Sequence, residues 1–447
     1  MNDFFKTCSK LALYIFLIFI GIIILCGSIT NGIVLSIISI GIIYLFVEKT
    51  EIKKFGLFIF ITSLIIKIIS IIFLKIPVQA DYELMYNASL DVLKGDFSFA
   101  NNFYFGTFGY QLGNVFYQAL VLKIINSANT LRVLNCIYSS VITLLIYLLI
   151  RKFSKEKTAR FISLFYTISL YPTYLNSVLG NQQLSLMLIL IGVYIFLTKK
   201  PKIMNLILIG LLIGLGNLER AEGIIYIACI IVYTLLQDKI NIKTIRNIAI
   251  IILAYFLINT TASFIVLKSG INDIGLKNNN PNWKLLTGLN VEDSGKYSSS
   301  DQDNYISDTE LEKKIIKERL TDYKNLPKLF YRKINVQWLY SDLTETFNAK
   351  NNSQFNQFMI KTLAGYAKSM NYFILLVVLF GQIKNKMSDI EKFFMLNVCA
   401  YFVIYLFIEV NARYYFNPQT SIMILSAVGI EKLIKILNDK HKKNKIK

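Results

Sequence analysis

Long apolar stretches alternate with short polar ones along almost the whole of this 447-residue chain. Because a bilayer core about 30 Å thick is crossed by roughly 20 residues of helix, such stretches predict membrane-spanning helices. The candidates are residues 11–28, 32–47, 56–75, 131–150, 161–178, 183–198, 203–217, 223–236, 247–267, 371–383, 393–409 and 419–437. The pattern predicts an all-α polytopic membrane protein with about 12 transmembrane helices.

The composition supports this fold class and excludes several kinds of chemistry. Hydrophobic residues make up 54% of the chain and charged residues only 17%, whereas charged residues are about 25% of a typical soluble domain. The single histidine, His441, lies in the basic C-terminal tail, which excludes His-based triads and His-ligated zinc elsewhere. The five cysteines show no CxxC spacing, so we expect neither a disulfide framework nor a zinc site.

The net charge of +20 is distributed unevenly along the chain. With the N-terminus inside, the short inner segments hold 24 Lys and Arg and the short outer segments hold 4. The positive-inside rule therefore predicts that both termini are cytoplasmic. We interpret the basic surplus as a membrane anchor and expect no nucleic-acid partner. The abundance of Ile, Lys and Asn is typical of an AT-rich bacterial genome, which suggests a bacterial plasma membrane.

This orientation divides the chain into three parts and leaves two regions at the outer face. Residues 1–267 form an N-terminal membrane region, in which 76–130 is interpreted as helices on the outer membrane surface. Residues 268–370 form an extracytoplasmic loop domain, and residues 371–447 contain the last transmembrane helices and the basic cytoplasmic tail. No segment is long enough for a cytoplasmic catalytic domain, so any chemistry is expected at the outer face or within the membrane. The two tryptophans are interpreted as interfacial belt residues.

Three outer segments bring charged side chains to the same membrane boundary. Their candidate residues are Asp81, Glu83 and Tyr86 in DYELMY, Arg220 in NLERAEG, and Arg413 with Tyr414 in NARYY. Charges beside apolar flanks are costly unless they are paired or functional. An Arg fork binds phosphate bidentately, and a carboxylate can accept the proton of an attacking hydroxyl. We therefore expect a site for an anionic, lipid-linked substrate.

Structural interpretations of the same residues stay open at this point. Asp81 could be the N-cap of the helix that follows it. Glu409 and Arg413 are four residues apart and could form an ordinary helix pair. Arg220 lies between two glutamates and could form a local ion cluster with them. Lys67, deep in the third apolar run, has no evident partner.

At these residues the chain resembles the GT-C superfamily of membrane glycosyltransferases. Within it, the chain is similar to the protein O-mannosyltransferases and lipid A aminoarabinose transferases with their bacterial relatives. The resemblance extends from about residue 56 to 437 and is carried by Asp81 with Tyr86 and LKGD, by GLGNLER with Arg220, and by Arg413–Tyr414 before the last span. One departure is that Tyr82 separates Asp81 from Glu83, whereas the mannosyltransferases have adjacent Asp and Glu.

The resemblance implies an inverting glycosyltransferase acting on the outer face of the membrane. It would move a sugar from a polyprenyl-phosphate carrier to a cell-envelope acceptor, which is a glycan, a glycolipid or a protein. The implied site residues are Asp81 as general base, Glu83 and Tyr86 in support, and Arg413, Arg220 and Tyr414 at the donor phosphate. No cofactor is demanded. A divalent metal, if one is used, would be held by Asp81 and Glu83, which are similar to the metal-binding acids of oligosaccharyltransferases.

Two other functions compete with this one. An O-antigen or capsule polymerase is also polytopic with one large outer loop, and it would use several outer-loop arginines. A lipid-linked sugar transporter would place polar groups near the bilayer midplane, often in repeated halves. Here the charges collect at the outer boundary and the two halves of the chain do not match, which favours the glycosyltransferase.

Overall fold

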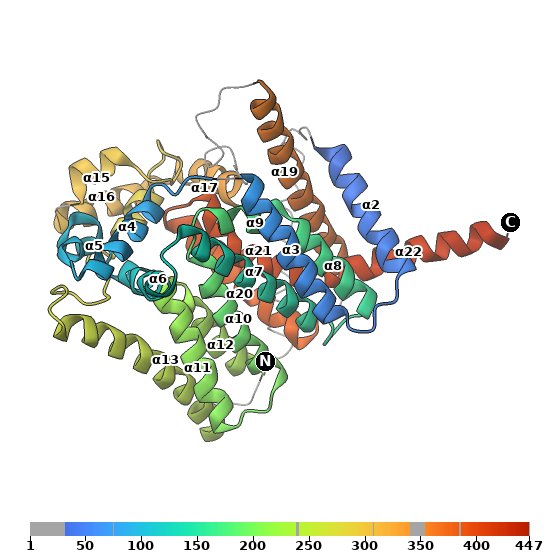
Figure 1. The fold of residues 1–447 in the computed structure, drawn as a ribbon, viewed down its shortest axis with the longest axis horizontal. Helices are drawn as coiled ribbons and strands as arrows, with labels where there is room; N and C mark the ends of the chain where they lie inside the picture. Colours follow the sequence, from blue (N-terminus) through green and yellow to red (C-terminus); the bar gives the residue numbers. More distant parts are fainter. Residues whose placement is uncertain are drawn as a thin grey trace.

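The computed structural model describes residues 32–74, 76–237, 241–306, 308–339, 354–383 and 386–446. Helices make up the fold (Figure 1), and the described ranges contain no β-strand, only an isolated bridge between Phe108 and Asn278. The prediction of an all-α protein is therefore confirmed. The first expected span, residues 11–28, lies outside the described residues.

The helices that form the membrane region are α2 (Ile33–Lys49), α3 (Phe55–Leu74), α7 (Ala128–Ile150), α8 (Glu156–Ile168), α9 (Leu170–Ser177), α10 (Gln182–Thr198), α11 (Ile203–Glu219), α12 (Gly223–Gln237), α13 (Ile242–Lys268), α19 (Gln354–Gln382), α20 (Asp389–Phe407), α21 (Phe416–Leu425) and α22 (Ala427–Ile446). Within the described residues, α3, α7, α13, α19 and α20 are long and apolar enough to cross a membrane. Three shorter apolar helices, α10, α11 and α12, accompany them. The protein is therefore a multi-pass membrane protein, as predicted.

The membrane helices divide into a central and a peripheral group. In α7, 61% of the most apolar window is buried inside the protein, whereas in α3 and α13 only 22% is buried. The outward side chains of the peripheral helices are large and apolar, for example Phe73 and Leu253. Such a surface would be unfavourable in water and suits contact with lipid.

One predicted span is divided in the structure. The apolar run 161–178 becomes α8 and α9, which are separated by Ser169 in an extended conformation. Pro172 explains the break, because its ring would clash with the carbonyl of Ile168 and it has no N–H to donate to that carbonyl. Pro172 lies inside the apolar run and marks this break in the sequence, but the span was predicted from apolar length alone.

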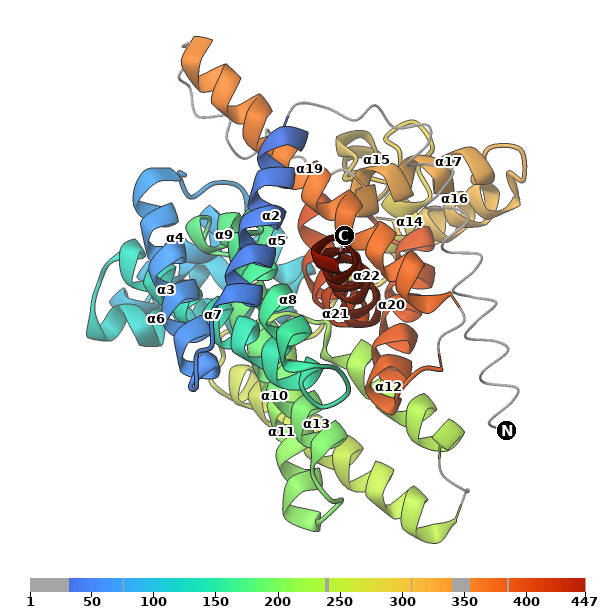
Figure 2. The same cartoon turned by 90° about the vertical axis from the view of Figure 1, so that its right-hand side faces the viewer.

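The close packing of α11 on α13 depends on two glycines. Gly210 and Gly214 are four residues apart, and a Cβ atom on either would collide with α13, at the backbone of Ile251 and the side chain of Ile258 respectively. Small residues at this spacing let two membrane helices approach closely. The two helices run side by side in Figures 1 and 2.

Residues 76–130, which the sequence predicts to lie outside and which we call the first outer region, consist largely of short helices. They are α4 (Asp81–Lys94), η1 (Ser98–Asn101), α5 (Phe103–Thr107), η2 (Gly109–Gln111) and α6 (Leu112–Ile124). At 13 residues, α6 is about 20 Å long and too short to cross the hydrocarbon core. The sequence interpretation of this apolar segment as a non-spanning helix agrees with that length.

The second outer region begins with α14 (Trp283–Gly288), α15 (Ser299–Tyr305), α16 (Thr309–Thr321), α17 (Leu326–Ile334) and η3 (Asn335–Leu339). It has its own small core, in which Trp283 is buried with Leu286, Leu289 and Ile316. Trp338 is also buried, against Phe402 and Tyr415. The interpretation of both tryptophans as belt residues was wrong, because this region folds back on itself and on the membrane helices.

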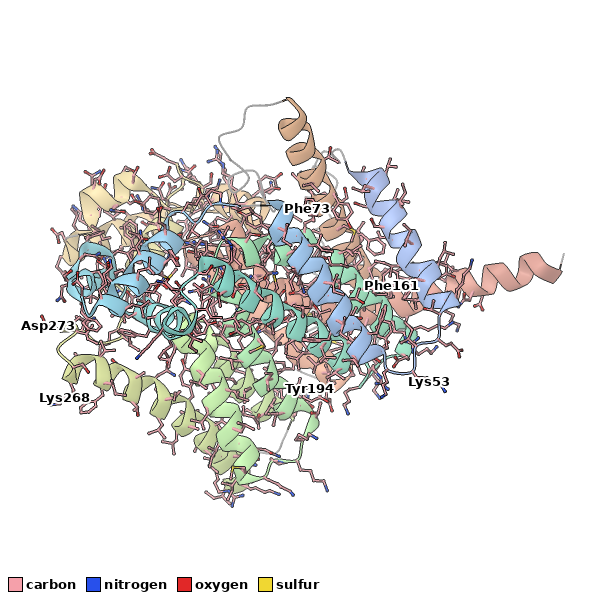
Figure 3. All side chains as sticks on the ribbon, viewed as in Figure 1. Lys53, Phe73, Phe161, Tyr194, Lys268 and Asp273 are labelled. Atoms are coloured by element: carbon pink, nitrogen blue, oxygen red, sulfur yellow. The ribbon has the colours of Figure 1, made fainter. Side chains whose placement is uncertain are left out.

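The two outer regions meet at one end of the molecule. The backbone N–H of Asn279 donates to the carbonyl of Thr107 at 2.9 Å, next to the Phe108–Asn278 bridge. In Figure 1, α4, α5, α15 and α16 lie at the left, and the basic helix α22 projects at the right. Figure 3 labels Phe73 and Lys53 at opposite ends of α3, and Lys268 at the end of α13 that lies toward the outer regions.

Backbone and side-chain bonds join the second outer region to the end of α20. The N–H of Glu409 donates to the carbonyl of Lys284, and the N–H of Val410 donates to that of Gly295. The buried Nζ of Lys333 donates to the carbonyls of Gly288, Leu406 and Ile408 at 2.7–2.8 Å. These bonds fix the loop region to the segment that contains Arg413.

Candidate functional site

Asp81 is the first residue of α4, immediately after a strained turn. The N-cap position belongs to Ala80, which has φ 54° and ψ −136° and offers no side-chain cap. The interpretation of Asp81 as the cap was therefore wrong. A carboxylate in the first turn interacts favourably with the helix dipole. A positive φ at a residue other than glycine is strained and is found most often where function constrains the backbone.

Arg413 pairs directly with Asp81, although 332 residues separate them. Arg413 Nη2 donates to Asp81 Oδ2 at 2.5 Å. Arg413 lies on η4 (Ala412–Tyr415). Asn411 is the N-cap of this helix, and its side chain accepts from the Arg413 N–H. The guanidinium also lies over the rings of Tyr82, at 5.3 Å, and of Tyr414, at 5.6 Å. The ion pair of Arg413 with Asp81 thus joins the segment after α20 to the start of α4.

Tyr414 joins this pair to two more cations. The guanidinium of Arg220 lies 5.2 Å from the centre of the Tyr414 ring, and Lys284 Nζ lies 5.6 Å from it. Lys284 also donates to Glu409 at 2.6 Å and to the Tyr414 hydroxyl at 3.2 Å. The Tyr414 hydroxyl donates to Glu409 at 3.1 Å. We call Arg220, Lys284 and Arg413 the cationic cluster.

Arg220 occupies the turn between α11 and α12, where it pairs with Glu222. Its Nη1 also donates to Asn181 Oδ1 at 3.3 Å. Glu222 accepts a further bond from Tyr401 at 2.8 Å. The predicted local ion cluster therefore exists with Glu222. Glu219 is not part of it, because its carboxylate accepts from Asn114 instead.

The cations of the cluster are held in their charged forms. Burial works against the charge of Arg413, but Tyr82, Tyr414 and Asp81 hold its pKa well above the usual value. Burial likewise disfavours the charge of Lys284, and Tyr414 and Glu409 more than offset it, so the pKa of Lys284 is raised. The pKa of Arg220 is raised, since Glu222 outweighs its burial. All three are therefore cationic at physiological pH.

Each cation of the cluster has one carboxylate partner, and these partners differ in exposure. The Asp81 side chain is 35% exposed, whereas Glu222 is 10% and Glu409 is 5% exposed. A general base must be within reach of the proton that it takes. Of the three carboxylates, Asp81 therefore has the most accessible side chain.

The structure brings together Asp81, Arg220, Arg413 and Tyr414, but it leaves out the two supporting candidates. Glu83 is exposed on α4. Tyr86 packs against a separate apolar cluster that contains Leu122 and Leu131. The predicted helix pair of Glu409 with Arg413 was wrong, because the chain between them is not helical and Glu409 binds Lys284.

The pair Asp81 and Glu83 does not fit a metal ion. Residues two apart on a helix face different directions, and the Asp81 carboxylate is already bound by Arg413. In the described ranges, no group of three His, Cys, Asp or Glu side chains could hold a metal. We derive no chemistry from a metal here.

Sequence reasoning missed Lys284 and Tyr104. Lys284 lies in the loop region beside a tryptophan, and no periodic pattern separates it from the other loop lysines. Tyr104, on α5, has a buried hydroxyl without a hydrogen-bond partner in the described structure. Burial, and then the charge of Asp81, raise the pKa of Tyr104. Only the contact between the two outer regions identifies these residues.

Comparisons with known proteins bear on part of the chain. Residues 113–264 match the family model described as dolichyl-phosphate-mannose-protein mannosyltransferase. Arg220 lies within this segment, whereas Asp81, Lys284 and Arg413 lie outside it. A comparison with curated proteins gave no match.

One solved structure similar to this chain is that of the archaeal oligosaccharyltransferase AglB from Archaeoglobus fulgidus, in complex with an inhibitory peptide and a dolichol-phosphate. The sequence identity is 12% and the TM-score is 0.49. The match covers 88% of this chain and 52% of that chain, so this chain spans about half the length of the oligosaccharyltransferase.

Proposed function

We propose that this chain is an inverting glycosyltransferase of the GT-C type, and the match of residues 113–264 to the model of the dolichyl-phosphate-mannose-protein mannosyltransferases supports this. It transfers a sugar from a polyprenyl-phosphate carrier to a cell-envelope acceptor. The observation that supports this most strongly is the convergence of Asp81, Arg220, Lys284 and Arg413 around Tyr414. A carrier phosphate and an acceptor hydroxyl need, respectively, a cationic pocket and a base beside it.

The donor phosphate binds at the cationic cluster. Arg413 and Arg220 offer planar forks of N–H donors, and Lys284 adds a point charge. The phenol ring of Tyr414 holds the three cations at 5.2–5.6 Å from its centre. This clustering in a partly buried place is unfavourable unless anions balance it. Glu222, Glu409 and Asp81 balance it in the structure, and an incoming phosphate offers acceptor oxygens to the Arg413 Nε donor that these carboxylates leave unfilled.

Asp81 acts as the general base toward the acceptor. The carrier phosphate leaves as a stable anion and needs little acid assistance, whereas an alcohol is a poor nucleophile until its proton is removed. Asp81 lies beside the cationic cluster and is the most exposed of its carboxylates. Glu222 and Glu409 keep Arg220 and Lys284 in position.

The site lies on the outer face of the membrane, in a bacterial plasma membrane with both termini in the cytoplasm. We predict that a thiol placed at Asn101 or Ser299 is labelled from outside, and that one at Lys155 or Lys243 is not, because of the distribution of Lys and Arg. All four positions are exposed in the structure. The measurement uses single-Cys variants in intact cells with an impermeant thiol reagent. Labelling at position 155 in sealed cells would reverse the orientation.

The activity is tested with purified protein in liposomes. A polyprenyl-phosphate carrier with a radiolabelled sugar and an extract of cell-envelope glycans are supplied together. We expect transfer of single sugars with release of the carrier phosphate. Growth of a long polymer would instead identify a polymerase, and movement of the intact carrier across the bilayer would identify a transporter. Absence of carrier phosphate release would contradict the proposal.

A further inference from the structure

In the structure, the proposed base and the proposed phosphate ligand bind each other. Arg413 Nη2 donates to Asp81 Oδ2 at 2.5 Å, so the positive charge that should meet the phosphate is neutralised by Asp81. A carboxylate held in such a pair is not free to approach an acceptor hydroxyl, which a general base must reach. If both residues work in the same reaction, the pair must separate during it.

The contact with Asp81 uses Nη2 of Arg413 and leaves its Nε without a partner in the described structure. In any arginine, Nε–H and one N–H of Nη2 point in the same direction and form a two-donor fork. In Arg413, Nη2 is bound to Asp81, but Nε is buried and has no hydrogen-bond partner in the described structure. Orphaned buried donors are rare in native proteins and call for an explanation. A ligand with two acceptor oxygens would use the whole fork and would displace Asp81 from it.

A second buried donor without a partner in the described structure, the hydroxyl of Tyr104, lies in the same charged environment. The Tyr104 hydroxyl is buried without a partner, and Tyr104 interacts electrostatically with Asp81, Arg413 and Lys284. A phosphate carries acceptor oxygens only, which matches unfilled donors on both residues. A phosphate bound here could therefore accept from both of these donors.

Building on the proposed function, we propose that the donor phosphate and Asp81 compete for the Nε–Nη2 edge of Arg413. Binding of the donor releases the Asp81 carboxylate, which then becomes the base for the acceptor hydroxyl. Without donor, Asp81 stays paired and does not activate an acceptor. The donor therefore acts before the acceptor in every cycle.

After the chemical step, Asp81 can pair with Arg413 again. The acceptor oxygen forms a bond to the anomeric carbon and gives its proton to Asp81, while the bond from that carbon to the phosphate oxygen breaks and the carrier phosphate keeps the electron pair. Protonated Asp81 is uncharged and does not compete for Arg413. When its proton passes to water, the carboxylate returns to Arg413 and displaces the carrier phosphate.

The test measures binding of a short-chain polyprenyl monophosphate, without sugar, to the full-length protein in nanodiscs by calorimetry. Asp81→Asn removes the competing charge and should bind the phosphate at least about threefold more tightly than wild type. Arg413→Ala should bind it at least about tenfold more weakly. In Arg413→Ala, the added Asp81→Asn change should bring no gain. Asp91→Asn, which removes a carboxylate paired with Lys94 on the same helix, should leave binding unchanged.

The outcomes separate this proposal from the function on which it rests. Equal or weaker binding by Asp81→Asn, with Arg413→Ala still weakened, would overturn the competition and leave the glycosyltransferase proposal intact. A gain from Asp81→Asn that persists in Arg413→Ala would overturn it too, since the gain would then be a general charge effect. No binding by wild type would overturn both. Asp81→Ser serves in place of Asp81→Asn if the latter does not purify as a folded monodisperse protein.

Discussion

Lys67 and the cationic cluster show two different ways in which this molecule holds positive charge. Lys67, within α3, is fully buried. Its Nζ donates to Ser63 Oγ at 2.7 Å and to Ser139 O and Thr143 Oγ1 at 3.0 Å each. An ammonium group has three donors, so every donor of Lys67 is used by neutral oxygens of its own helix and of α7.

The cations of the cationic cluster are bound by carboxylates, whereas Lys67 is bound by neutral oxygens. Arg220, Lys284 and Arg413 are each paired with a carboxylate and share one phenol ring. Arg413 nevertheless keeps an unfilled buried donor. Its partner Asp81 is about one-third exposed, so the pair remains open to exchange.

The difference shows how a structural cation can be told from a functional one in a membrane protein. An intramembrane charge is by default a functional candidate, yet Lys67 is saturated by the groups that join two helices. Saturated donors hold a fold together, whereas unfilled donors beside an exposed carboxylate mark a place for a ligand. The predictions below test this distinction.

The largest effect is expected from Asp81→Asn. This change keeps the shape of the side chain but removes the charge that takes the proton, and general bases typically contribute about 10²–10⁴-fold. We predict a loss of turnover of at least about 100-fold, with normal insertion and thermal stability. The measurement is single-turnover transfer from a labelled donor by purified protein.

Glu83→Gln is the matched control for Asp81→Asn. It removes a carboxylate two residues away on the same helix, where the side chain is exposed and faces a different direction. Its turnover should fall much less. Near-normal turnover of Asp81→Asn would remove Asp81 from the chemistry, and a larger loss in Glu83→Gln would transfer the role to that residue.

The next effect concerns donor affinity in Arg413→Ala. Charge-assisted hydrogen bonds contribute about 1.5–3 kcal/mol, so affinity for the donor should fall by roughly 10- to 100-fold. Arg413→Lys should restore only part of it, because an ammonium lacks the planar fork. Arg332→Ala is the control, since Arg332 binds a loop carbonyl outside the cluster. Equal donor affinity in wild type, Arg413→Ala and Arg413→Lys would reject Arg413 as the phosphate ligand.

Much of the fold and half of the site follow from sequence because they depend on local patterns. Apolar length predicts the helices. The distribution of Lys and Arg among the loops predicted that Asp81, Arg220 and Arg413 lie at the same membrane boundary. The structure adds that these three segments touch one another. Residue type and position therefore predicted three of the charged residues that lie together, without knowledge of the packing.

The remainder depends on tertiary contacts that leave no local signal. Lys284 enters the site because the loop region is bound to the end of α20 through Lys333 and two backbone bonds. Two of the three partners of Lys67 come from α7, about 70 residues away along the chain. Asp81 resembled a helix cap because only backbone angles distinguish the cap from the first helical residue.

The smallest effect is expected from Lys67→Met, which is compared with Lys284→Met. In Lys67→Met, Ser63 and Thr143 can still bond each other, since their hydroxyls are 3.1 Å apart. Replacing a buried ionic group by an apolar one of similar size is often neutral or stabilising. We therefore predict donor affinity within about twofold of wild type, with thermal stability unchanged or raised.

Lys284→Met removes a charge from the cluster and leaves Glu409 buried without its cation, so donor affinity should fall by about tenfold. Both variants replace a lysine by methionine, at a fully buried position for Lys67 and at a 31% exposed one for Lys284, so a difference between them reports on location rather than on residue type. Loss of donor affinity in Lys67→Met at unchanged stability would show that a saturated cation can also serve the site, and the distinction between saturated and unfilled donors would then fail.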